Sequence, residues 1–176
     1  MTDGPHDAPG DARDDSLDDV RDLYQAVVLR HGRNPTHQRR LDPFDASARG
    51  ENPMCGDRVE VRLRLDAEGT VAEAAFEARG CAISVASADL MAEAAPGRTP
   101  AELRDLAAAF DAMVRTGHCP DCLGDLRALS GVHDYPSRIR CATLPWTALV
   151  QALDATPAMG ATAPAPARHT EEAHHG

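Results

Sequence analysis

Aromatic side chains are scarce in this sequence, where Phe, Tyr and Trp together make up 3% of the 176 residues. A hydrophobic core must therefore be built mainly from Ala, Val, Leu and Ile. Apolar residues reach 43% and charged residues 26%, which are ordinary fractions for a globular protein. The length favours one domain with tails over two full domains.

The sequence also lacks any run of about 20 apolar residues, the length that crosses a bilayer, so no membrane span is expected. The N-terminal stretch MTDGPHDAPGDARDD has neither the basic region nor the apolar region of a secretory signal. We therefore expect a cytoplasmic protein, whose thiols are kept reduced. In that compartment five cysteines indicate metal or sulfur chemistry before disulfides.

Positive charge is in deficit, because the formal net charge is −10. Nucleic acid is not an expected partner, since the chain offers little to replace the counterions of a phosphate backbone. A basic protein surface suits an acidic chain better. The segment HGRNPTHQRR (31–40) is a basic island, which is either a solvated loop or a contact for a partner.

The composition divides the chain into three parts. Residues 1–15 are acidic, contain Gly and Pro and lack periodicity, which predicts a disordered tail. The folded domain is expected over residues 16–154, with Ser16 as the N-cap of a first helix. Residues 155–176 are rich in Ala, Pro and His and are expected to form a second disordered tail.

Two segments near the middle of the chain are predicted to be strands. The strict alternation of RVEVRLRL (58–65) predicts a half-buried strand, and TVAEAAFEA (70–78) returns after a turn as a second one. A third strand is expected within 43–52 on a weaker signal. The strands come first and most helices later, which indicates an α+β fold with a small antiparallel sheet of about three strands.

Four helices are predicted after the strands, at 82–94, from Thr99 onward, at 125–132 and at 145–154. Thr99 is followed by Pro100 and, three residues on, by Glu102, which is the pattern of a capping box. Gly131 is expected to stop the third of these helices, and Pro145 to open the fourth.

Three cysteines and one aspartate lie at the predicted edges of elements. Cys55 and Asp57 flank Gly56, which allows a sharp turn; Cys81 opens a helix, and Cys141 precedes the last helix. A Cys₃Asp set could hold a tetrahedral zinc ion. Iron–sulfur clusters also take thiolates, so the donors alone do not choose the metal. No two of these cysteines form a CxxC pair, and the alternative is ordinary buried cysteines.

The segments that surround these cysteines identify a family. They are LYQAVVLRHGRNPTHQ, NPMCGD, FEARGCAISVAS, LGDLRALSGV and RIRCATLPW, in this order. Together they resemble the SufU branch of the IscU/NifU N-terminal family, which serves iron–sulfur cluster assembly. The resemblance runs from about Leu23 to Leu153, and the fold that it implies is a small antiparallel sheet with helices packed on it.

The resemblance implies a metal site, since its positions match Cys55, Asp57, Cys81 and Cys141. Arg140 stands where the scaffold branch has a histidine directly before its third cysteine.

The branch also carries a longer insertion between its second and third site cysteines, filled here by residues from about 97 to 136. Arg138 matches an arginine that the branch keeps near the metal, although a plain surface arginine is the alternative.

The function implied is that of a zinc-dependent sulfurtransferase rather than a small-molecule enzyme. A SufS-like cysteine desulfurase would supply persulfide sulfur, a histidine of that partner would take the zinc position of Cys55, and the freed Cys55 thiolate would accept the sulfur. The sulfur would then pass to a downstream iron–sulfur assembly scaffold. Two alternatives remain, a scaffold that builds an Fe–S cluster and a structural zinc protein that acts as an adaptor.

Two features depart from the family pattern. The segment HCPDC contains Cys119 and Cys122, which could form half of a second metal site, a reversible disulfide or inert thiols. Asp89, in ASADLM, replaces what is often a serine and is expected to be a surface change.

Overall fold

The computed structural model describes residues 12–119 and 121–156. Its elements follow one another as α1 (Ala12–Arg33), β1 (Ala46–Asn52), β2 (Asp57–Leu65), β3 (Val71–Arg79), α2 (Ala82–Ala94), α3 (Pro100–Thr116), the 3₁₀ segment η1 (Asp121–Asp134) and α4 (Pro136–Ala155). The two predicted tails fall largely outside the described residues, and α1 begins at Ala12 rather than at Ser16.

The sheet has three antiparallel strands in the order β1-β2-β3. Val59, Val61 and Leu63 of β2 are buried on one face, as the alternating pattern predicts, and the intervening Glu60 and Arg62 face the other way. The weaker prediction of a third strand is confirmed, because β1 pairs with β2 from Ala46 to Asn52. The turn between these two strands contains Cys55.

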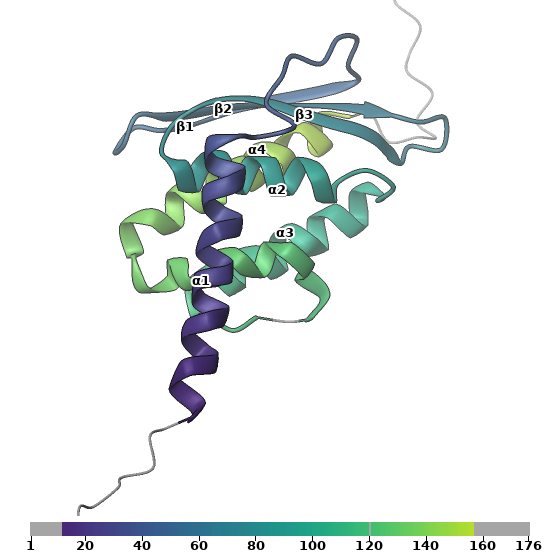
Figure 1. Ribbon diagram of the computed structural model, residues 1–176. Helices are drawn as coiled ribbons and strands as arrows, with labels where there is room; N and C mark the ends of the chain where they lie inside the picture. The colour runs from purple at the N-terminus through teal and green to yellow at the C-terminus, as the bar shows by residue number, and fades with distance from the viewer. Residues whose placement is uncertain (1–11, 120, 157–176) are drawn as a thin grey trace, which may run out of the picture.

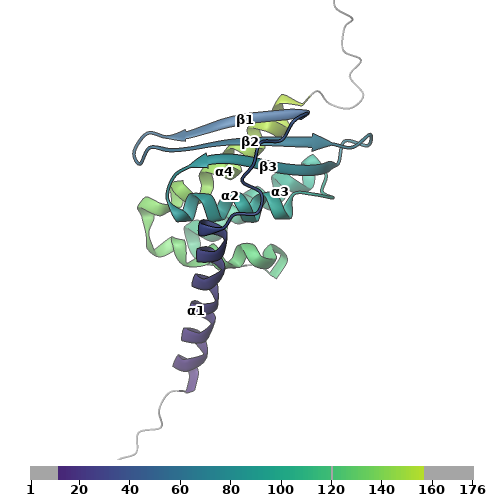
Figure 2. The same cartoon turned by 45° about the horizontal axis from the view of Figure 1, so that its top comes forward.

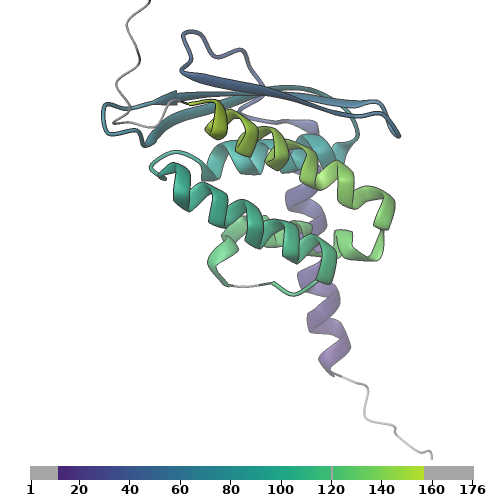
Figure 3. The same cartoon turned by 180° about the vertical axis from the view of Figure 1, so that it is seen from behind.

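The helices lie on one side of the sheet (Figures 1 and 2). α2 and α4 pack directly against it, with α4 under β1 and β2 and α2 under β3. α3 and η1 form a further layer beneath α2 and α4, which the view from behind shows (Figure 3). The C-terminal part of α1 packs along α2, and its N-terminal part projects away from the sheet. The α+β class is confirmed.

The core between these layers consists mainly of Ala, Val and Leu, as the shortage of aromatics predicts. The indole of Trp146 in α4 stacks on the ring of Phe110 in α3, with centroids 4.8 Å apart. This pair joins the two helix layers. None of the helices described is long and apolar enough to span a membrane.

Two helix predictions are wrong at their ends. α4 begins at Pro136, and Pro145 lies inside it rather than at its start. By sequence preference Pro145 fits the start of a helix, and a proline in the interior is unfavourable. The residues on both sides of Pro145 are buried, and this packing keeps the helix continuous. η1 extends past Gly131 to Asp134, so that glycine does not end the helix. The start of α3 is confirmed, with both hydrogen bonds of the capping box at Thr99 and Glu102.

The basic island 31–40 is partly structural. His31 is buried, and the backbone N–H of Arg39 donates to the carbonyl of Phe76 in β3. Asp89, expected on the surface, has no exposed area at all. That prediction is wrong because Asp89 lies on the face of α2 that packs against α1 and the 31–40 segment, where it meets two histidines.

Candidate metal site

The turn between β1 and β2 carries the first two candidate ligands. Asn52 and Asp57 are paired at the ends of the strands, and the Asn52 carbonyl accepts hydrogen bonds from the backbone N–H groups of Gly56 (2.8 Å) and Cys55 (3.3 Å). Gly56 has a φ of 74°, which glycine adopts without strain. The turn therefore places the Cys55 side chain on the surface and returns the chain so that Asp57 is buried.

Asp57 and the start of α2 are fitted closely together. One carboxylate oxygen, Oδ1, accepts the backbone N–H of Cys81 at 3.2 Å. The other, Oδ2, lies 3.8 Å from Cys81 Sγ. A Cβ atom on Gly80 would come within 2.6 Å of Oδ1, so only glycine leaves room for the carboxylate at this position.

Cys141 reaches the site from α4 and is buried, with 1% of its surface exposed. Two hydrogen bonds hold this part of α4 on α2. The Ser87 hydroxyl donates to the carbonyl of Ala142 at 2.6 Å, and the Trp146 indole N–H donates to Ser87 Oγ at 3.2 Å. The position of Cys141 is thus set by buried contacts one residue away from it.

These elements bring the predicted ligands together. The Sγ atoms of Cys55 and Cys141 are 3.8 Å apart, and the ligand atoms of Cys55, Asp57 and Cys141 all lie within 4.8 Å of one another. Cys81 lies outside this set of three but next to it, with its Sγ 3.8 Å from Asp57 Oδ2. At 3.8 Å the two sulfurs are free thiols, since a disulfide bond measures about 2.05 Å.

The donor set fits zinc in both chemistry and spacing. Thiolates and a carboxylate are accepted zinc ligands, and two sulfurs bound at about 2.3 Å to a tetrahedral ion are about 3.8 Å apart. The spacing of Cys55 and Cys141 agrees with that value. Thiolates also hold iron–sulfur clusters, so the geometry of the sulfurs by itself is compatible with both groups.

The electrostatics of the site favour a bound cation. Burial raises the pKa of the Cys141 thiol, and its contacts with Asp57, Cys81 and Cys55 raise it further. In the absence of a cation, the raised pKa therefore keeps Cys141 a thiol at neutral pH. A divalent cation reverses this effect, since it favours the thiolate and carboxylate forms together.

Arg138 stands one helical turn before Cys141 and is exposed. Attraction to Cys81 is the main reason that the pKa of its guanidinium is raised, and a hydrogen bond to Cys141 adds to this. The prediction that Arg138 lies beside the candidate ligands therefore agrees with its surroundings. Arg140 is exposed as well.

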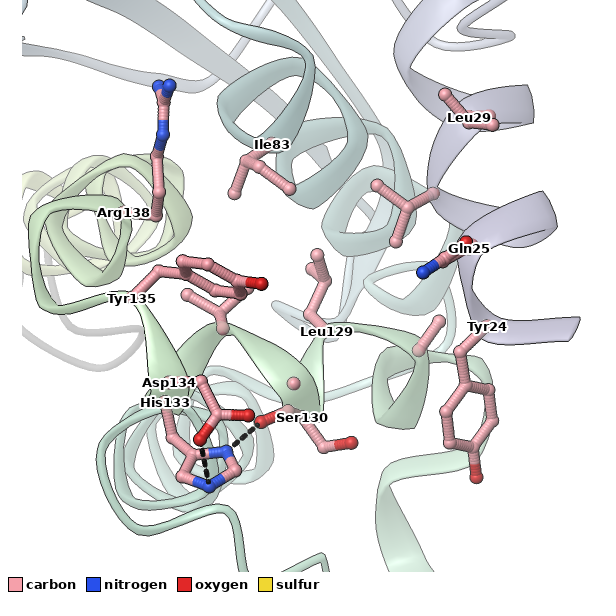
Figure 4. Close-up of a pocket in the computed structure, with 14 residues that line it drawn as sticks. Tyr24, Gln25, Leu29, Ile83, Leu129, Ser130, His133, Asp134, Tyr135 and Arg138 are labelled. Atoms are coloured by element: carbon pink, nitrogen blue, oxygen red, sulfur yellow. Dashed lines mark hydrogen bonds and ion pairs between the residues drawn. The ribbon is translucent and has the colours of Figure 1, made fainter. Parts of the chain in front are cut away.

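A groove of about 720 Å³ opens next to Arg138 (Figure 4). α1 supplies Tyr24, Gln25, Val28 and Leu29 to it, and residues 128–135 form the facing wall. Ile83, two residues beyond Cys81, lines the groove together with Arg138, so the groove borders the cluster of cysteines. In Figure 4, Arg138 and Ile83 lie at the same end of the groove, opposite Tyr24.

Sequence reasoning missed three residues that shape the site, namely Gly80, Ser87 and Trp146. Gly80 carried a local signal, because a glycine directly before a candidate ligand suggests a close approach. The other two carried none, since a serine and a tryptophan in apolar helices are equally typical of core packing. Cys119 lies elsewhere, with its Sγ 3.5 Å from Met113 Sδ, and the side chain of Cys122 falls outside the described part of the chain.

The sequence matches a family model, that of the NifU-like N terminal domain, over residues 23–142. The match covers more than half of the chain. The protein belongs to the NifU-like N-terminal family.

Relatives within this family carry names of two kinds. The chain is 38% identical over 129 residues to the zinc-dependent sulfurtransferase SufU of Bacillus subtilis (strain 168), a stretch that covers 72% of this chain and 86% of the relative. It is 37% identical over 139 residues to the iron–sulfur cluster assembly scaffold protein IscU of Streptococcus pyogenes serotype M1, covering 78% and 86%. The resemblance to the SufU branch of the IscU/NifU family is thus confirmed.

A solved structure agrees with the fold. The crystal structure of a nitrogen-fixing NifU-like protein (N-terminal) from Brucella abortus superposes with a TM-score of 0.69 at 28% identity. The superposition covers 77% of this chain and 94% of that one. This member of the NifU-like N-terminal family therefore keeps the family's sheet and helices.

Proposed function

We propose that this protein serves iron–sulfur cluster assembly as a zinc-dependent sulfurtransferase. Cys55, Asp57, Cys81 and Cys141 hold the zinc ion, and Cys55 accepts persulfide sulfur from a SufS-like cysteine desulfurase. The sulfur then passes to a downstream scaffold. Its relationship to the SufU of B. subtilis supports the proposal.

The observation that carries this proposal is the graded exposure of the three cysteines. Cys141 is buried and Cys81 is half-buried, whereas Cys55 is exposed at the tip of a four-residue turn. A sulfur donor can reach Cys55 without any movement of the helices. The surroundings of Cys81 and Cys141 suit fixed ligands, because Cys81 is the N-cap of the packed helix α2 and Cys141 lies buried within α4.

The chemical step is thiol–persulfide exchange. The Cys55 thiolate attacks the outer sulfur of the donor persulfide, the donor's S–S bond breaks, and the donor cysteine leaves as a thiolate. The new bond joins the transferred sulfur to Cys55 Sγ, so atoms and electrons balance without an external oxidant. Zinc, when bound, keeps the cysteines ionised at neutral pH. Arg138 supplies a fixed positive charge beside the thiolates.

Arg140 favours zinc over an iron–sulfur cluster. It occupies the position directly before Cys141, where a histidine would add a further metal ligand. A guanidinium group has no lone pair to offer a metal at neutral pH. The site thus has three thiolates and a single carboxylate, which suits one tetrahedral zinc ion.

The groove beside Arg138 is the surface on which we place the desulfurase. A donor whose persulfide reaches Cys55 must also cover the residues around the cysteines, and this groove is continuous with them through Arg138 and Ile83. Leu29, 46% exposed, offers an apolar contact at its edge. Arg138 favours a donor that carries a carboxylate near its persulfide loop.

The test is the turnover of a SufS-like desulfurase on cysteine, with and without the zinc-loaded protein. We expect the protein to stimulate turnover and to carry one additional sulfur on Cys55, which mass spectrometry of peptides can locate. Cys55→Ser should abolish both effects. Cys119→Ser is the matched control, since it removes a thiol outside the site and should leave both unchanged.

Two results would contradict the proposal. Stimulation that survives Cys55→Ser would rule out Cys55 as the acceptor. A purified protein that holds iron and acid-labile sulfide in place of zinc would support the scaffold function that the relationship to IscU of S. pyogenes suggests.

The groove is tested separately with two charge-introducing variants. Leu29→Glu should weaken binding of the desulfurase, seen as a higher concentration for half-maximal stimulation. Phe44→Glu alters another exposed apolar side chain, 40% exposed, that lies outside the groove and should have no such effect. Equal effects of the two variants would place the partner elsewhere.

A further inference from the structure

A second cluster of titratable residues lies behind the candidate metal site, around Asp89 in the middle of α2. Its carboxylate is fully buried. Oδ2 lies 2.6 Å from His31 Nδ1 at the end of α1. Oδ1 accepts the backbone N–H of His37 at 2.8 Å and lies 3.2 Å from Nδ1 of the same residue.

The buried carboxylate is well compensated. Burial acts to raise the pKa of Asp89, but the hydrogen bonds from His31 and from the backbone N–H groups of His37 and Thr36 outweigh it and hold the pKa below its usual value. Asp89 is therefore an ionised group that accepts hydrogen bonds on both oxygens. The end of α1, the loop that follows it and α2 thus meet at this one side chain.

His31 extends the network on the far side of its ring. The guanidinium of Arg30 lies 3.2 Å from His31 Nε2, and Glu93 of α2 lies 3.9 Å from the same atom. Nδ1 faces Asp89 and Nε2 faces Arg30, so the His31 ring bridges the carboxylate and the guanidinium. The ring is 3% exposed, so its contact with Asp89 is shielded from water.

The next residue along α1 links this network to the metal site. Gly32 packs on Ala82, the residue after Cys81. A Cβ atom on Gly32 would lie 3.0 Å from the Ala82 carbonyl oxygen and 3.2 Å from the Ala82 Cβ. The last turn of α1 thus packs on the first turn of α2. The contacts of Asp89 hold the same two helices together two turns further along α2.

We propose that Asp89 is a positioning residue which clamps α1 and the 31–40 segment onto α2 and thereby fixes the place of Cys81 at the metal site. The clamp acts through His31 and His37 on one side and through the contact of Gly32 with Ala82 on the other. The inference rests on the proposed zinc site, because it assigns Cys81 a ligand role. A loosened clamp would let the start of α2 move away from Asp57 and raise the rate at which zinc leaves.

The experiment compares Asp89→Asn with Thr99→Ala, which removes the cap of α3 and so destabilises a helix other than α1 and α2. Both variants are loaded with zinc, and zinc release to a coloured chelator is timed. We expect release to be about tenfold faster in Asp89→Asn, the low end of the effect of losing an outer-shell partner of a metal, and unchanged in Thr99→Ala.

Hydrogen exchange of the metal-free proteins gives a reading that does not depend on zinc. The first hydrogen-bonded amides of α2, from residue 85 to 88, should lose protection in Asp89→Asn and keep it in Thr99→Ala. Should Asp89→Asn not fold, His37→Gln removes a single contact at a ring that is partly exposed and should give the same pattern at smaller size.

Each result decides between the clamp and a purely structural role. Unchanged zinc release and unchanged exchange at residues 85–88, together with a lower melting temperature, would overturn the proposal. If the wild-type protein bound no zinc, the proposed function would fail, whereas the exchange measurement would still test the clamp.

Discussion

Replacing Gly80 with alanine tests whether the fit between Asp57 and the start of α2 builds the site. The added methyl group would lie 2.6 Å from Asp57 Oδ1 and 2.8 Å from its Cγ, both closer than real Cβ contacts allow. Asp57 would have to turn away, and the hydrogen bond from the Cys81 N–H would be lost. Overpacking costs about 1–3 kcal/mol, and a buried hydrogen bond to a charged group about 1.5–3 kcal/mol. We expect Gly80→Ala to lower the free energy of unfolding of the metal-free protein by about 2.5–6 kcal/mol.

Urea denaturation of four proteins separates this clash from a general effect of alanine. They are wild type, Gly80→Ala, Asp57→Ala and the double variant, which form a double-mutant cycle. Asp57→Ala removes both atoms that come nearest to the new methyl group, so Gly80→Ala should cost at least about 1 kcal/mol less in that background.

Gly131→Ala is the control for the loss of a glycine, because a Cβ there meets nothing within 4 Å. It should change the free energy of unfolding by less than about 1 kcal/mol. Equal costs for Gly80→Ala and Gly131→Ala, or equal costs of Gly80→Ala with and without Asp57, would refute the reasoning.

Three further outcomes are expected. Zinc at 100 times its dissociation constant should stabilise the protein by about 2.7 kcal/mol. Zinc binding should also release protons, because the raised pKa keeps Cys141 a thiol before binding. Calorimetry in buffers of different ionisation enthalpy measures this release. The stability difference between wild type and Asp89→Asn should hold down to about pH 4, the range of an unfolded aspartate. It should then shrink as the pH falls through the lowered native pKa, which acid titration of unfolding below pH 5 can follow. Thr99→Ala should cost about 1 kcal/mol by removing the cap of α3 without changing zinc release, and a faster release would show that the cap reaches the site.

The sequence by itself determined the strands, the start of α3 and the four candidate ligands. Each of these has a local cause. The alternation of apolar and charged residues marks β2, a capping box marks Thr99, and Gly56 permits the turn that separates Cys55 from Asp57. The motifs around the cysteines identified the family because they are contiguous in the chain. Local signals of this kind do not depend on what packs against the segment.

Only the tertiary structure decided the features that depend on a distant neighbour. Pro145 reads as a helix start, yet α4 runs through it because the helix is buried against α2, α3 and the sheet. The sequence predicts Asp89 to be a surface residue, but in the structure His31 and His37 contact its carboxylate and it is buried. The ranking of Cys55, Cys81 and Cys141 from exposed to buried also has no sequence signature, since it arises where a turn and two helices meet. Burial is a property of what surrounds a residue, and the surroundings of these residues come from segments more than 20 positions away.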